Sequence, residues 1–222
     1  MGIFFGKNKW KPDYESGKVI SSILDEAFTY ASEAKNSAHL ESAKTKYYSI
    51  VGQTFEDDPD FIQRMDSFLE WFIFDYMPEG GAPGGIYQSY LEQKRHASTT
   101  DEMLARMEIS KNHQSVFLVL EYKPGVVKVK DLVLKKKYYV TCDDSLEEND
   151  LLMSRIIHFN DKSYFSRSHC LHPKAAFKFI KGAIKKIGKA SITSDFFLQL
   201  GAMQLKWRRS RQIDMKHIYV MR

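Results

Sequence analysis

Apolar residues recur every three or four positions through most of the first 112 residues, which is the spacing of helices that bury one side. The clearest example runs from Phe61 to Tyr76. It follows Asp58 and Pro59, which predict an N-cap and a first helical residue. Further helices are expected over residues 18–35, 38–51, 86–95 and 98–110. The pattern therefore predicts a helical unit over residues 1–112.

The pattern changes at about residue 113, where short β-branched and aromatic runs alternate with turn residues such as Pro124-Gly125 and Asn160-Asp161. Strands are expected over residues 116–122, 126–132, 137–142, 151–159 and 163–171. Five short strands in about sixty residues predict a small antiparallel barrel or strongly twisted sheet over residues 113–172.

Helical spacing returns in the segment 173–222, with one helix expected over 174–186, closed by Gly188, and another over 194–211. Residues 213–221 are expected to form a short strand or an extended tail. The predicted fold class is α+β, with a helical N-terminal unit, a five-stranded antiparallel module and two C-terminal helices that pack on the rest.

Composition favours a cytoplasmic globular protein. The chain has 222 residues and 43% hydrophobic residues, enough for one large domain or two small ones. It has two cysteines, Cys142 and Cys170, which argues against a disulfide scaffold and favours a reducing compartment. No apolar run reaches the roughly 18 residues of a membrane-spanning helix.

Charge is distributed unevenly along the chain. Of its 33 basic and 28 acidic residues, 12 and 2 lie in residues 173–222, which gives this segment a net charge of +10. The first 172 residues hold the remaining 21 basic and 26 acidic residues, a net charge of −5. We therefore expect a non-enzymatic binding or adaptor protein that contacts an anionic macromolecule, either RNA, single-stranded DNA or an acidic protein. An anionic membrane surface is a further alternative.

The expected contacts lie on the two C-terminal helices. Lysine and arginine side chains would bind phosphates, and an indole would stack on a base. The predicted anion-binding residues are Lys181, Lys185, Lys206, Trp207, Arg208, Arg209 and Arg211. Lys135–Lys137 in the strand-rich module would extend this surface. The opposing interpretation is that these charges form a solvated helix face or pair with the acidic N-terminal half.

Two other function classes stay open. In the first, the apolar side of the last helix and Trp207 form a dimer or partner interface. In the second, the aromatic helix Trp71–Tyr76 lines an enzyme pocket around Asp75. The sequence favours a structural role for Asp75, which would hydrogen-bond backbone amides or an arginine such as Arg155.

Other motifs give weaker signals. His169-Cys170-Leu171-His172 and Cys142 together supply at most three zinc ligands, whereas structural zinc takes four, so no metal or cofactor is predicted. Residues Gly80–Gly85 lack the Lys-Ser/Thr of a phosphate-binding loop and contain Pro83, which favours a simple turn.

The segment Phe68–Tyr76 has the pattern F-x-x-W-F-x-F-D-Y, and a small β module follows it. The module contains the segments Val129–Leu132, Tyr138–Val140, Asp150–Ile157 and His172-Pro173. Over about residues 55–175 the chain resembles uncharacterised bacterial proteins, some of which carry a SEC-C zinc motif. This resemblance implies no settled activity. The chain lacks the SEC-C cysteine cluster, so neither zinc binding nor a SecB-like or ribosome-linked role is implied.

Overall fold

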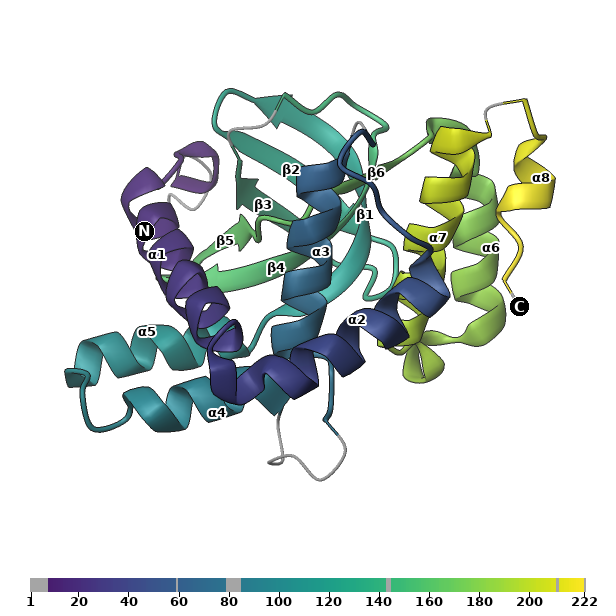
Figure 1. Ribbon diagram of the computed structural model, residues 1–222. Coiled ribbons are helices and arrows are strands. Elements are labelled where there is room, and N and C mark those ends of the chain that lie inside the picture. Colours follow the sequence, from purple (N-terminus) through teal and green to yellow (C-terminus); the bar gives the residue numbers. More distant parts are fainter. Residues whose placement is uncertain (1–7, 59, 79–84, 143–144, 211, 222) are drawn as a thin grey trace, which may run out of the picture.

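The computed structural model (Figure 1) describes residues 8–58, 60–78, 85–142, 145–210 and 212–221. These residues form helices and a β-sheet, which confirms the α+β class. The α-helices are α1 (Tyr14–Ala31), α2 (Ser37–Val51), α3 (Phe61–Phe74), α4 (Gly85–Lys94), α5 (Thr100–Ser110), α6 (Phe177–Ile187), α7 (Ser194–Arg209) and α8 (Met215–Ile218). The strands are β1 (His113–Lys123), β2 (Val126–Asp131), β3 (Lys137–Thr141), β4 (Leu151–Phe159), β5 (Lys162–Phe165) and β6 (Cys170–His172).

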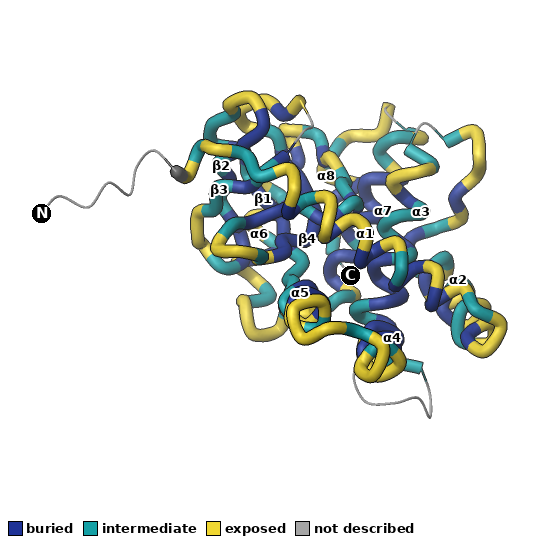
Figure 2. Tube along the Cα trace, turned by 90° about the vertical axis from the view of Figure 1, so that its left-hand side faces the viewer, coloured by how far each residue is buried: buried dark blue, intermediate teal, exposed yellow. Residues whose placement is uncertain are grey.

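The strands form a barrel with helices packed around it. Figure 1 shows α1 on one side of the barrel and α6, α7 and α8 on the other, with α4 and α5 below. Figure 2 shows the exposed sides of α4 and α5 turned outward. Among the described helices, none combines the length and apolar character needed to cross a membrane.

The strand order β1-β2-β3-β5-β4 closes because β4 also pairs with β1. The five-stranded barrel predicted from the sequence is therefore confirmed. One of its pairings differs from the all-antiparallel prediction, because β3 and β5 are parallel through Val140 opposite Ser163 and Thr141 opposite Tyr164. The reason is that β5 pairs with β4 in a hairpin along one edge, while its other edge closes the barrel against β3, a strand that is more distant in the sequence.

The strand expected over residues 163–171 is two strands in the structure. β5 and β6 follow one another along the same edge of β4. The chain leaves the sheet between them, where the hydroxyl of Ser166 and the backbone amide of Ser168 donate to Glu70 (2.8 and 2.9 Å). The hairpin turn at Asn160 and Asp161 is as expected, and both residues have positive φ.

Strand β4 joins three hydrophobic clusters. Its inward residues Leu152 and Ile156 belong to the barrel interior. On the outer side, Leu151 and Met153 pack with the C-terminal helices, and Ile157 packs with the N-terminal helices. This is why β4 is a nearly continuous buried run and does not alternate between buried and exposed residues.

Helix ends follow the sequence signals in most places. α5 begins with a capping box between Thr99 and Glu102, and Gly188, with φ of +80°, ends α6. Two expectations were wrong: α3 has its N-cap at Asp60, not Asp58, and the tail over 213–221 contains the short helix α8. Residues 80–84 of the predicted glycine turn lie outside the described residues.

Candidate functional site

Helix α6 presents lysines on the side opposite to its buried residues Ile180 and Ile184. We call Lys178, Lys181, Lys185 and Lys186, together with Lys189 in the 3-10 helix η4 (Lys189–Ser191) that follows, the α6 lysines; all five are exposed. Within the described part of the chain, none of them forms an ion pair or a hydrogen bond. Their charges are therefore uncompensated and open to solvent, as the sequence predicted for Lys181 and Lys185.

The arginines of α7 behave differently. Arg208 lies 3.0 Å (Nε to Oδ2) from Asp60, and Arg209 lies 2.6 Å (Nη2 to Oδ2) from Asp58. The side chain of Arg209 also donates to the carbonyl of Gln53 (2.8 Å). The expectation of uncompensated charge is therefore wrong for these two arginines, because the acidic residues that precede α3 fold against α7.

The other predicted contacts near the end of α7 divide into three cases. Lys206 is exposed. Trp207 is half-buried and packs against the cluster formed by the C-terminal helices, and the Arg208 guanidinium lies 5.6 Å from the centre of its ring. Arg211 lies outside the described residues. Part of the Trp207 indole is therefore buried against the protein's own core.

A second group of lysines lies on and beside the outer face of the barrel. Lys130 on β2 is directly opposite Lys137 on β3, and Lys128 is opposite Tyr139. Like charges placed directly across a sheet repel one another, so a bound anion would relieve this contact. We call Lys128, Lys130, Lys135, Lys136 and Lys137 the barrel lysines.

The barrel lysines border the C-terminal helices. Leu118, which is opposite Lys130 across the sheet, packs against the same cluster as α6, and so do Leu132 and Val133 at the end of β2. Sequence reasoning included Lys135–Lys137 but missed Lys128 and Lys130. The alternation of valine and lysine in β2 was the signal that these two lysines point out of the barrel.

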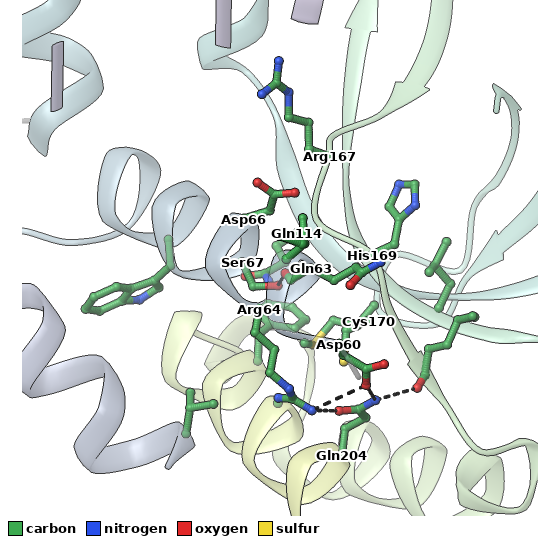
Figure 3. A pocket seen from close by; sticks show the side chains of 18 of the residues that line it. Asp60, Gln63, Arg64, Asp66, Ser67, Gln114, Arg167, His169, Cys170 and Gln204 are labelled. Carbon is green, nitrogen blue, oxygen red and sulfur yellow. Dashed lines mark hydrogen bonds and ion pairs between the residues drawn. The ribbon is translucent and has the colours of Figure 1, made fainter. Parts of the chain in front are cut away.

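A cavity of about 620 Å³ lies between α3, α7 and β6 (Figure 3). At one end, Gln204 receives a hydrogen bond from Arg64 and donates to Asp60 (3.3 Å) and to the carbonyl of Leu171 (3.2 Å). Arg64 and Gln204 are buried. This network ties α3, β6 and α7 together. It was not predictable from the sequence, because its members are far apart along the chain.

The chemistry of this cavity does not favour nucleophilic catalysis. Cys170 lines it, but burial raises the pKa of the thiol to about 12, which leaves it protonated at neutral pH. Burial also raises the pKa of Asp66, on the other side of the cavity. Ser67 shares a hydrogen bond with Ser168 (2.6 Å).

Asp75 has the structural role that the sequence favours. Arg155 donates to its carboxylate and to the side chain of Asn112 (2.9 Å). Glu70 lies 3.7 Å from the same guanidinium, and burial raises the pKa of Glu70 against the opposing effect of Arg155. Asp75 lines neither the cavity in Figure 3 nor the shallower one beside α1.

Cys142 is separated from Cys170 and His172, which share β6 and lie against the cluster of the C-terminal helices. Cys142 packs inside the barrel, and Cys170 packs against the C-terminal cluster. His172 shares a hydrogen bond with the Tyr219 hydroxyl (2.9 Å). Among the described residues, no group of three or more His, Cys, Asp or Glu side chains is placed to hold a metal ion.

The dimer interface considered for α7 would need apolar side chains of this helix to be exposed. Phe196, Phe197, Leu200 and Met203 are all buried within the chain. The apolar side of this helix is therefore already covered by the protein's own core.

Comparison with known proteins gives a family and no function. No curated protein and no solved structure matches the chain. A family model described as "Family of unknown function (DUF7986)" matches residues 24–197, from α1 through the barrel and α6 into α7. Since this match covers more than half of the chain, the protein belongs to that family.

Proposed function

We propose that this protein binds single-stranded RNA or DNA, without catalysis and in the cytoplasm, through the α6 lysines and the barrel lysines. One observation carries the proposal: the five α6 lysines are exposed and unpaired within the described part of the chain. The barrel lysines extend this charge onto an adjoining element. A polyanion that contacts both groups would release counterions from its phosphates, which drives association.

Single-stranded nucleic acid fits this surface better than an acidic protein. The lysines lie on a helix and on a curved sheet face, and a flexible polymer can follow both. Small β-barrels also bind oligonucleotides on an outer sheet face beside their loops. The proposal departs from the sequence-based hypothesis in one respect, because the main contacts move from Arg208 and Arg209 to lysines.

The test is a binding titration at several salt concentrations. A fluorescein-labelled oligothymidylate of about 12 nucleotides falls within the roughly 4–16 nucleotides that one small barrel covers. Fluorescence anisotropy should show an affinity that falls linearly on a log–log plot against salt, with a slope of about −0.7 for each phosphate contact. No binding at low salt, or an affinity that does not change with salt, would eliminate the proposal.

A pair of charge-matched variants locates the contact. The triple variant K178Q/K181Q/K185Q removes three unpaired charges from α6. The control K18Q/K44Q/K111Q also removes three charges, but from lysines that pair with Glu15, Glu41 and Glu108, each three residues earlier in the sequence. The α6 variant should lose about two units of salt slope and bind more weakly. The control should bind as the wild type does. Equal loss in both variants would indicate attraction by net charge alone.

A further inference from the structure

Two aromatic rings lie on the outer face of the barrel, outside its cores. Trp10, in the short 3-10 helix η1 (Asn8–Trp10), contacts Tyr139 of β3 edge-on, with ring centres 5.0 Å apart and an angle of 84° between the planes. Neither residue belongs to any of the three hydrophobic clusters. Figure 2 shows the first described residues beside β2 and β3. These half-buried rings thus lie at the surface and do not support the core.

Lysine ammonium groups lie against both rings. Lys123 Nζ is 4.1 Å from the centre of a ring of Trp10. Lys9 Nζ and Lys128 Nζ are each 5.5 Å from the centre of the Tyr139 ring. Five residues from η1, β1, β2 and β3 therefore form one cluster of two rings and three cations. We call it the Trp10 cluster.

We propose that the Trp10 cluster is the site where unpaired bases stack. This inference rests on the proposed function and adds the part of the ligand that distinguishes nucleic acid from other polyanions. A base would take the place of Lys123 against the indole, and the freed ammonium group would turn to a phosphate. An exposed cation–π contact is worth about 2- to 5-fold in an equilibrium constant. Stacking of one base on an aromatic ring is worth roughly 5- to 150-fold, so the exchange favours the bound state.

The surrounding charges suit a phosphate backbone. Glu121 is the one carboxylate that the described ion pairs place here, 3.3 Å from Lys123 and 4.0 Å from Lys128, so three positive charges face one negative charge. Along β2, Lys130 follows Lys128 on the same face, about 7 Å further on. Lys130 borders the side of the barrel on which the C-terminal helices pack. A strand stacked at Trp10 therefore has a path of lysines toward α6.

The experiment compares an oligonucleotide with a polyanion that has no bases. The probes are labelled oligothymidylate and sodium polyphosphate, and the variants are W10A and Y139A, with W10F and Y139F as ring-preserving controls. Each alanine variant should bind oligothymidylate about 5- to 150-fold more weakly. Polyphosphate affinity should not change, and the phenylalanine variants should keep most of the oligonucleotide affinity. Circular dichroism checks that each variant is folded.

Tryptophan fluorescence gives a second measurement that does not depend on affinity. Trp71 is buried and Trp207 is half-buried in the C-terminal cluster, so stacking should quench Trp10 selectively. Saturating oligothymidylate should quench the wild type and W207F but leave W10F unchanged.

The outcomes separate this inference from the proposed function. If the wild type binds oligothymidylate with the expected salt dependence but W10A and Y139A bind equally well, the stacking site is wrong and the proposed function stands. Equal weakening toward both probes, or quenching that survives in W10F, also overturns the stacking site. If the wild type binds no oligonucleotide, both proposals fail.

Discussion

The guanidinium of Arg155 on β4 donates to the carboxylate of Asp75 at the end of α3, and this contact joins the barrel to the N-terminal helices. Arg155 lies between Met153, which packs with the C-terminal helices, and Ile157, which packs with the N-terminal ones. It is 3% exposed, and Glu70 beside it is 2% exposed. The charge of this arginine therefore depends on partners inside the protein.

Replacing Arg155 with methionine should lower the free energy of unfolding by about 3–5 kcal/mol, because it leaves the buried carboxylate of Glu70 without its cation. The variant D75N should cost about 1 kcal/mol, because Asp75 is partly exposed and asparagine retains a hydrogen-bonding oxygen. Urea denaturation followed by circular dichroism measures both. Similar costs for R155M and D75N would contradict this ranking.

His172 should make the fold sensitive to acid. Burial lowers its pKa from 6.5 to about 3, so below pH 6.5 the unfolded chain binds a proton that the folded protein does not. Its contribution to stability is complete above pH 6.5 and falls by about 1.4 kcal/mol per pH unit toward pH 3.

In the variant H172Q this pH dependence of the unfolding free energy is absent. The wild type should therefore lose about 2 kcal/mol relative to H172Q between pH 6.5 and about pH 5. Urea denaturation at both pH values tests this, and a constant difference would show that His172 takes up a proton as readily in the folded protein as in the unfolded chain.

Substituting the α7 arginines should affect stability more than binding. The variant R208Q/R209Q removes the contacts with Asp60 and Asp58, which are partly exposed ion pairs worth at most about 1 kcal/mol each. Its affinity for oligothymidylate should stay close to that of the wild type, because these arginines are already paired. A loss of affinity as large as that of K178Q/K181Q/K185Q would show that Arg208 and Arg209 contact the nucleic acid.

Two glycine substitutions should have opposite effects. Gly125, in the turn between β1 and β2, has φ of +80°, and a methyl group there would collide with the Tyr14 hydroxyl. G125A should therefore destabilise the protein by more than about 1 kcal/mol. Gly182 lies in α6 with nothing within 4 Å of the added carbon, so G182A should stabilise it by about 0.5–1 kcal/mol. Thermal denaturation distinguishes the two, and equal shifts would contradict the argument.

Periodicity predicted most elements because each buries a regular pattern of side chains. The alternation in β2 and the three- and four-residue spacing in α6 are local signals, and both elements formed where expected. The parallel pairing of β3 with β5 was not predictable in this way. It depends on barrel closure, which no single segment encodes.

The candidate binding surface also combines features that a local pattern predicts with features that depend on distant parts of the chain. The exposed α6 lysines followed from the helical pattern alone. The pairing of Arg208 with Asp60 did not, because it required knowing that the turn before α3 lies against α7. Trp10 gave no signal at all, since a single tryptophan in a short polar stretch has no periodic context.

The shared clusters of β4 have a consequence for synthesis on the ribosome. The core of the first five helices includes Ile157 and Tyr164 from the barrel and Leu198 from α7. When α5 leaves the ribosome exit tunnel, those side chains are still missing, and the nascent helices expose apolar surface until most of the chain has been translated. Expression of residues 1–112 alone should therefore give an aggregation-prone fragment, and a chaperone that shields nascent chains would act during this interval.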